Sequence, residues 1–173
     1  QYSGEGFEYL RKAIEKKFNK SLEELAKEYV FQPLNMNDTS YIWNEKKNAE
    51  RIVIGYDKNG RPYDIVKNKT ASAADDLVTS VEDYSKFLIG VMNNNLLSPE
   101  VFEAMKTKQI ETKKNKYFGL GFEIYDLGNN EIALSRGGSD KGVNTIAFIL
   151  PKTRQGLVIF TNVDDGYKIY EPI

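Results

Sequence analysis

Histidine and cysteine are both absent from the 173 residues of this sequence. Without histidine the chain lacks the commonest general base and the commonest metal ligand, and without cysteine it lacks disulfides, thiolate nucleophiles and thiolate metal sites. Tyrosine and lysine remain as the side chains that can activate a nucleophile. We therefore expect no metal and no other cofactor. The missing cysteines favour neither an oxidising nor a reducing compartment.

Long apolar runs and an excess of one charge are also missing. No run of about 18 apolar residues occurs, so we predict no membrane-spanning segment. Basic and acidic residues nearly balance, at 24 and 25, and no basic stripe indicates a nucleic-acid partner. Apolar residues make up 40% of the chain, which together with its length is typical of one globular domain.

Helical periodicity dominates the first third of the chain. Apolar residues recur on one face in residues 7–18 and again in residues 22–30. Ser21 has the spacing of a capping box before the second helix, and Pro33 is expected to end that helix. Residues 31–36 then read as a compact apolar turn that packs against both helices.

Residues 38–79 form a long polar stretch without helical periodicity. Within it, the sequence Asp-Lys-Asn-Gly at 57–60 predicts a hairpin turn, flanked by strands at 52–54 and 63–66. A loop of this length in a compact domain is usually functional or an insertion.

Two more helices and a set of strands follow. Ser80 is the expected cap of one helix, with Tyr84, Phe87, Leu88, Val91 and Met92 as its buried stripe. Ser98-Pro99 opens a shorter helix whose predicted inward residues are Val101, Phe102 and Met105.

After Tyr117 the apolar period changes to two, which predicts an antiparallel meander. Its expected parts are a strand through Leu120, Phe122 and Ile124, a turn at 128–130, a return strand at 132–135, and two strands at 145–150 and 157–162. Because helices come first and strands last, the order of elements predicts an α+β fold.

Two short glycine-rich or acidic segments match known motifs incompletely. Residues 137–141 nearly spell the G-x-S-x-G nucleophile elbow, but the last position is Lys141 and no histidine is present to deprotonate the serine. Asp164-Asp165-Gly166 lacks the remaining ligands of a calcium loop. We interpret both segments as turns.

Four other segments form a consistent series. They are Tyr2-Ser3-Gly4 at the start of a helix, residues 31–36, residues 74–80 leading into the next helix, and residues 135–140 at a strand. In order and spacing they resemble the serine β-lactamase and penicillin-binding protein superfamily, in the branch of class C β-lactamases, D-amino-acid peptidases and related esterases. The resemblance runs from Tyr2 to about Asn162, where Phe160-Thr161-Asn162 closes a strand.

This resemblance implies a β-lactamase/DD-peptidase-like α+β fold, with helices packed on an antiparallel sheet and present as a partial domain. Residues 1–173 are then the C-terminal portion of a single catalytic domain, in which 1–116 are mainly helical with a long loop and 117–163 form the antiparallel strands. No serine in the sequence is followed three residues later by lysine, the S-x-x-K motif that carries the family's nucleophile. We therefore expect the N-terminal half of the same domain to supply that motif and to be a partner of this chain.

The resemblance also implies roles for individual residues. Tyr2 takes the place of the family's general base, a role that a phenol with a pKa of about 10 can perform only beside cations. Arg136-Gly137-Gly138 takes the place of the family's Lys-Thr-Gly or His-x-Gly motif on an inner strand, where the guanidinium is expected to bind an anionic group of the substrate. The backbone N–H of Ser139 corresponds to one half of the oxyanion hole.

Departures from the family pattern leave alternatives open. Gly4 stands where asparagine is commonest, which puts β-lactam specificity in question. Taken without the resemblance, Arg136 is better explained as a charge at a strand end that faces water, with the two glycines forming a bulge, and the resemblance reverses this preference. The sequence thus predicts either a serine hydrolase that acts on an amide or ester through an acyl-enzyme, or a non-catalytic relative that binds peptidoglycan-like peptides or a protein partner.

The resemblance also implies a class of substrate and a cellular location. The substrate is expected to be a small molecule or a peptide, and the family suggests a periplasmic or exported location. We also predict a tendency of this chain to self-associate, because the strands at 146–150 and 157–160 are nearly all apolar and so are expected to be covered on both faces.

Overall fold

The structure is a computed structural model that describes residues 3–94 and 96–170. It divides into two compact units, the first made of residues 1–52 and 65–87 and the second of residues 53–64 and 88–173. In the part of the chain that is described, no helix combines the length and the apolar character needed to cross a membrane.

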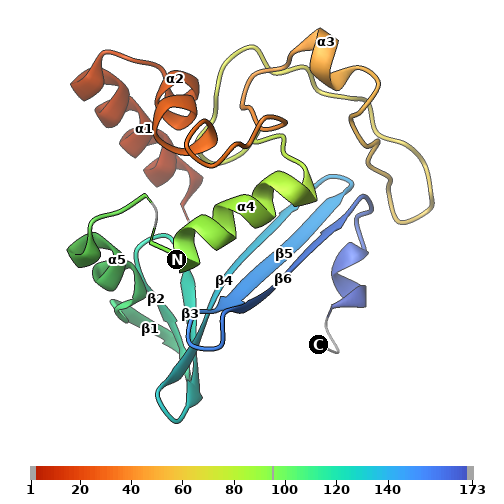
Figure 1. The fold of residues 1–173 in the computed structure, drawn as a ribbon. Coiled ribbons are helices and arrows are strands. Elements are labelled where there is room, and N and C mark those ends of the chain that lie inside the picture. The colour runs from red at the N-terminus through yellow and green to blue at the C-terminus, as the bar shows by residue number, and fades with distance from the viewer. Residues whose placement is uncertain (1–2, 95, 171–173) are drawn as a thin grey trace. The chain divides into compact units, whose positions relative to one another are not determined.

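The first unit is built from short helices and loops (Figure 1). Its elements are α1 (Gly4–Phe18), α2 (Leu22–Ala26), the π-helix η1 (Lys27–Phe31), α3 (Glu45–Asn48) and the first part of α4 (Val81–Met92). The predicted capping box is present, because the Ser21 hydroxyl accepts from the backbone N–H of Glu24 and the Glu24 carboxylate accepts from that of Ser21. The second predicted helix consists of α2 and the π-helix η1 that continues it, and it ends at Phe31, shortly before Pro33 as predicted.

The core of the first unit lies after α1 in the chain, around residues 25–36. Leu25, Phe31, Leu34 and Met36 are buried, which confirms the predicted apolar turn. The apolar face of α1 is buried less than its periodicity suggested, since Leu10 is 56% exposed and Phe18 48%.

A buried carboxylate joins α4 to the loop before α3. The Asp83 carboxylate accepts from the backbone N–H of Asp38 at 2.7 Å, from the Thr39 hydroxyl at 3.0 Å and from the Lys86 ammonium at 2.9 Å. The Ser80 hydroxyl in turn accepts from the backbone N–H of Asp83 at 3.1 Å, as expected for the cap of α4. These bonds fix the start of α4 within this unit.

The second unit is a six-stranded antiparallel sheet with two short helices and the C-terminal part of α4 (Figure 1). Its strands follow one another in space as in sequence, which is the predicted meander. The elements are α5 (Pro99–Lys106), β1 (Ile110–Lys113), β2 (Lys116–Phe118), β3 (Glu123–Gly128), β4 (Glu131–Asp140), β5 (Val143–Leu150), β6 (Gln155–Thr161) and the 3-10 helix η2 (Gly166–Ile169).

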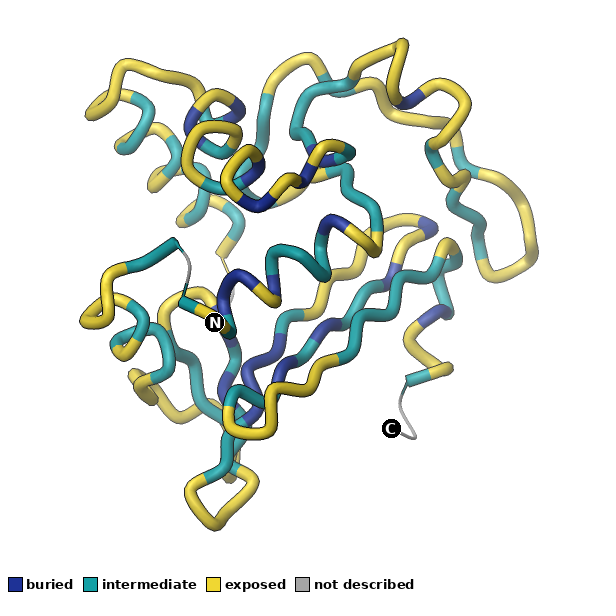
Figure 2. Tube along the Cα trace, viewed as in Figure 1, coloured by how far each residue is buried: buried dark blue, intermediate teal, exposed yellow. Residues whose placement is uncertain are grey.

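The core of the second unit lies along the central strands (Figure 2). Ile124, Leu134 and Ile149 are fully buried, and they are neighbours across β3, β4 and β5 because Leu134 pairs with both of the others. Apolar side chains on one face of adjacent strands supply most of the stability of such a sheet.

Three sequence predictions about this unit are wrong in detail. The sheet begins at Ile110, earlier than Tyr117, and Leu120 lies outside the strands at 50% exposure because the chain turns at Gly121, which has φ +88°. Val101 of α5 is 48% exposed, and no residue of this helix is fully buried.

The predicted hairpin turn is present, but its flanking strands are not. Gly60 has φ +79°, and the only pairing inside the hairpin is an isolated bridge between Tyr56 and Pro62 within the described residues. The upstream flank pairs elsewhere: the backbone N–H of Tyr56 donates to the Asn162 carbonyl at 2.9 Å, and that of Asp164 donates to the Tyr56 carbonyl at 3.0 Å. Residues 53–64 are therefore held by the segment after β6.

Candidate functional site

The first motif lies at the start of α1. Tyr2, the predicted general base, falls outside the described residues, and α1 begins at Gly4 as the sequence predicts. The Ser3 hydroxyl accepts from the backbone N–H of Gly6 at 3.1 Å, so Ser3 caps the helix. Gly4 lies beside Ala74, since a Cβ on Gly4 would be 3.5 Å from the Ala74 Cβ. The first and third motifs are thus neighbours within the first unit.

Glu8 holds these two motifs together. Its carboxylate accepts from the backbone N–H of Ala73 at 2.5 Å and from the Ser72 hydroxyl at 3.2 Å, and it forms an ion pair with Arg11 at 2.8 Å. The hydrogen bond from Arg11, followed by that from Ala73, lowers the pKa of Glu8 below its usual value of 4.5. Glu8 therefore stays ionised at neutral pH and fixes the start of α1 against residues 72–74.

The fourth motif lies near the end of β4. Arg136 pairs with Ala147, Gly138 with Thr145 and Ser139 with Asn144, in an unbroken antiparallel register with β5. The alternative in which the two glycines form a bulge is therefore wrong. The glycine at 138 has a steric reason, because a Cβ there would lie 2.9 Å from the Thr145 hydroxyl oxygen.

On its other side this part of β4 has an open edge. Pairing between β3 and β4 stops at Glu123 with Ser135, and among the described residues no strand continues it along residues 136–140. In β3 the backbone N–H of Asp126 donates to the Asn115 carbonyl, on the β2 side, at 2.9 Å. Backbone polar groups alternate in direction along a strand, so those of Glu123 point towards β4, and those of its partner Ser135 point towards β3.

The same alternation carries on past the end of β3. Gly137 and Ser139 direct their N–H and C=O groups to the side on which Ser135 meets β3. Residues 137–140 are all exposed, and the Arg136 side chain beside them is half-buried. The edge thus presents backbone donors and acceptors at glycine-rich positions next to a guanidinium, an arrangement that can pair with an extended backbone and an anionic group.

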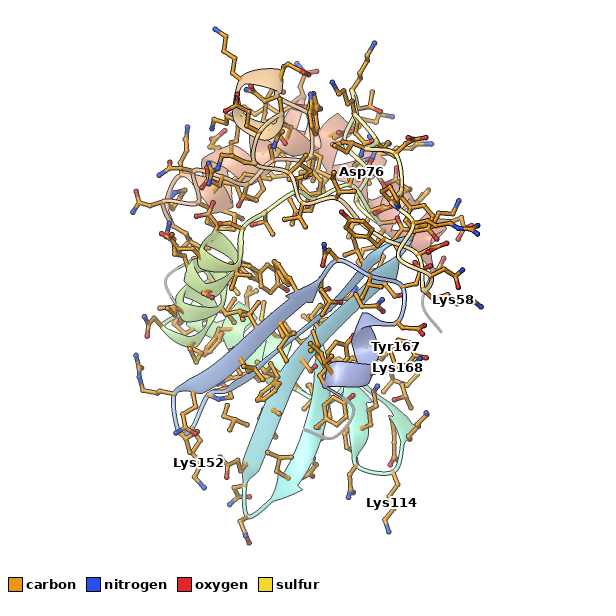
Figure 3. The ribbon with its side chains drawn as sticks, turned by 90° about the vertical axis from the view of Figure 1, so that its right-hand side faces the viewer. Lys58, Asp76, Lys114, Lys152, Tyr167 and Lys168 are labelled. Atoms are coloured by element: carbon orange, nitrogen blue, oxygen red, sulfur yellow. The ribbon has the colours of Figure 1, made fainter. Side chains whose placement is uncertain are left out.

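A cluster that sequence reasoning missed holds the turn after β4. The Asp164 carboxylate accepts from the backbone N–H of Gly142 at 2.7 Å and from the Tyr63 hydroxyl at 2.9 Å. The side-chain amide of Asn144, which is 3% exposed, donates to the carbonyls of Val163 and Asp164 at 2.9 and 2.8 Å. Figure 3 shows Tyr167 and Lys168 on η2, which follows this segment in the chain.

The local sequence does not indicate this role of Asp164, because its partners lie far away in the chain. Tyr63 is 101 residues distant from it, and no local pattern reports such a contact. Asn144 offered a weak signal, because asparagine is disfavoured in a strand of otherwise apolar residues and needs hydrogen-bond partners when buried.

The comparisons with known proteins agree with this architecture. The sequence model of the Beta-lactamase family matches residues 1–171, and the chain belongs to that family. No curated protein sequence is significantly similar to it. Fold similarity to solved structures is extensive, and three of them illustrate it.

A penicillin-binding protein from Bacillus halodurans superposes with a TM-score of 0.84 at 20% identity, over 99% of this chain and 55% of its own. The octameric penicillin-binding protein homologue from Pyrococcus abyssi gives 0.80 at 27% identity, over 96% and 39%. The D-amino acid amidase from Ochrobactrum anthropi SV3 gives 0.81 at 23% identity, over 99% and 59%. This chain therefore has the fold of β-lactamase-family serine hydrolases and spans about half the length of these proteins.

Proposed function

We propose that the protein containing this chain is a serine hydrolase that cleaves an amide or ester bond through an acyl-enzyme. In this proposal residues 1–173 are the C-terminal portion of the single catalytic domain, and the N-terminal half supplies the nucleophilic serine and its lysine. The observation that supports it most directly is the open edge of β4 at Gly137 and Ser139, next to Arg136.

Each group at this edge has a chemical role in the proposed reaction. An extended substrate can add to the edge as a strand, because Gly137 and Gly138 carry no side chain to block its backbone. The N–H of Ser139 donates to the oxyanion that forms as the nucleophile attacks the carbonyl. Arg136 binds an anionic group of the substrate and cannot carry protons, because a guanidinium stays protonated at all accessible pH values.

Tyr2 is proposed as the general base for the nucleophile. A phenol has an ordinary pKa of about 10, so it accepts a proton near neutrality only where a neighbouring cation stabilises the phenolate. The lysine of an S-x-x-K motif would be such a cation. Ser3 and Glu8 hold the start of the helix that follows Tyr2 in the chain.

The substrate class follows from the cation and the strand edge. We propose a peptide-like amide or a related ester that carries a carboxylate, a class that is chemically akin to D-amino-acid peptides. The D-amino acid amidase among the similar structures acts, as its name states, on amides of D-amino acids. The absence of asparagine at Gly4 argues against a β-lactam as the preferred substrate.

The test uses the full-length protein and looks for the acyl intermediate directly. Mass spectrometry after incubation with a fluorophosphonate or a D-amino-acyl ester is expected to show one covalent adduct on a serine outside this chain.

A second experiment tests the role of Arg136. Arg136→Ala is expected to weaken the binding of carboxylated substrates by about 2–4 kcal/mol and to leave that of neutral esters unchanged, whereas Arg136→Lys is expected to bind carboxylated substrates with intermediate affinity. Equal losses for charged and neutral substrates would assign Arg136 a structural role.

A second function is supported by the two altered motifs. Gly4, which stands where the family most often has asparagine, and Arg136 depart from the family pattern, as expected of a pseudo-hydrolase that binds peptidoglycan-like peptides or a protein partner. Saturable binding of such a peptide by the full-length protein, with no adduct and no turnover, would favour this function over hydrolysis.

A further inference from the structure

The buried amide of Asn144 lies directly opposite Ser139 in the register of β4 and β5. Both of its N–H groups are used, one for the carbonyl of Val163 and one for that of Asp164, at 2.9 and 2.8 Å. The backbone carbonyl of Asn144 also accepts from the Thr161 hydroxyl at 2.9 Å. Asn144 thus holds the segment after β6 against β5.

Asp164 extends this connection to the turn that joins β4 and β5. Its carboxylate accepts from the backbone N–H of Gly142 at 2.7 Å, and Gly142 lies between Asp140 of β4 and Val143 of β5. The second carboxylate oxygen accepts from the Tyr63 hydroxyl at 2.9 Å. A chain of hydrogen bonds therefore runs from Asn144 through Asp164 to the end of β4.

We propose that Asn144 and Asp164 are positioning residues that hold the backbone of Ser139 in place for substrate binding and for the oxyanion. Past Ser135, β4 is paired on one side only, so its position depends on β5 and on the turn at Gly142. Strand ends supported on one side open more readily than central strands. Oxyanion stabilisation requires a donor that is fixed before the reaction, and a displacement of about 1 Å can cost about 100-fold in rate.

This inference rests on the proposed function in its catalytic part only. The structural part, that Asn144 and Asp164 restrain residues 136–142, can be tested without any substrate. Hydrogen exchange of these amides in the full-length protein is expected to accelerate by about tenfold or more in Asn144→Ala and Asp164→Ala. In Asp164→Asn the new amide oxygen still accepts from Gly142, so exchange is expected to stay near that of the unchanged protein.

The catalytic part is read from kcat and KM of the same variants. Because the oxyanion exists only near the transition state, kcat is expected to fall about tenfold in Asn144→Ala and Asp164→Ala while KM changes by less than about threefold. Asp164→Asn is expected to recover most of kcat. Leu25→Ala, which truncates a core residue of the other unit, is the control: it lowers thermal stability but leaves kcat per folded molecule unchanged.

The outcomes separate this inference from the proposed function. Unchanged exchange at residues 136–142 in both alanine variants would overturn it, and so would faster exchange with an unchanged kcat. If the full-length protein hydrolyses nothing, the proposed function fails, and the exchange measurement alone then decides whether Asn144 and Asp164 restrain the edge.

Discussion

Gly55 and Gly142 approach each other so closely that neither position has room for a side chain. A Cβ on Gly55 would lie 2.9 Å from the Gly142 carbonyl oxygen, and a Cβ on Gly142 would lie 2.7 Å from the Gly55 Cα. Gly142 also has φ +69°, a conformation that side chains disfavour. The two glycines therefore allow the loop of residues 53–64 to lie directly against the turn between β4 and β5.

Gly55→Ala is expected to detach this loop. The added methyl group collides with backbone, which cannot move aside as a flexible side chain can, so we expect a loss of about 1–3 kcal/mol in the free energy of unfolding. Hydrogen exchange gives the local reading: the amides of Tyr56 and Asp164, which bond across this contact, are expected to exchange faster.

Gly60→Ala is the matched control for this prediction. Gly60 also lies in the loop and has φ +79°, but a Cβ there meets nothing within 4 Å. This substitution strains the turn without a collision, so the amides of Tyr56 and Asp164 are expected to keep their protection. Similar exchange in the two variants would mean that the glycine contact does not hold the loop.

Acid is expected to weaken the attachment of α1 to residues 72–74. The pKa of Glu8 is lowered in the folded state, so its carboxylate contributes stability that is present above the unfolded value of 4.5 and is lost as pH falls through the lower folded-state pKa. The amide proton of Ala73 reports this directly, because it donates to Glu8. Its NMR chemical shift is expected to titrate below pH 4.5 and not between pH 5 and 8.

Two glutamine variants separate Glu8 from its neighbours. Glu8→Gln is expected to abolish the titration of the Ala73 amide, whereas Glu5→Gln, which changes the acidic residue in the first turn of α1, is expected to preserve it. A titration that survives Glu8→Gln would assign the bond to another group.

Local signals in the sequence predicted helix caps and turns, whereas contacts between distant residues determine where the strands end and which of their edges stay open. The capping box at Ser21 and the turn at Gly128 were predictable because each depends on residues within a few positions. Leu120 was misplaced because Gly121 turns the chain and interrupts the alternation that Phe122 resumes. The open edge of β4 could not be predicted, because it depends on where β3 ends relative to Ser135.

In the candidate site, too, some residues are identified by a local motif and others only by contacts in the folded chain. Arg136 and the two glycines after it were found through a motif, and the structure places them on β4 beside an open edge. Asp164 was missed because its role depends on Gly142 and Tyr63, which approach it only in the folded chain.

The 173-residue chain by itself is expected to have no hydrolase activity. It contains no Ser-x-x-Lys sequence, and neither Tyr2 nor Arg136 is a nucleophile able to form the acyl intermediate. Hydrolysis of nitrocefin and of p-nitrophenyl acetate by the purified chain is expected to match the buffer rate. Turnover that persists in Tyr2→Phe would show that another residue of this chain acts as the nucleophile.

The last prediction concerns the outer edge of β6. In the described part of the chain β6 is the end of the sheet, and β5 is the one strand paired with it. Its residues 157–159 are Leu-Val-Ile, all half-buried, so apolar side chains lie along this end strand of the sheet. Exposed strand edges of this kind pair with other chains unless they are covered.

We therefore expect the isolated chain to self-associate or to be only marginally stable, and a separate N-terminal half of the domain to restore a cooperative monomeric complex. Val158→Lys is a direct probe, because a charge on the edge strand opposes pairing between copies, and it is expected to reduce association in sedimentation velocity. Lys152→Glu is the matched control, since it changes charge in the β5–β6 turn, outside the edge strand itself. A cooperative and thermally stable monomer of the unchanged chain would contradict the prediction, because the β6 edge would then need no partner.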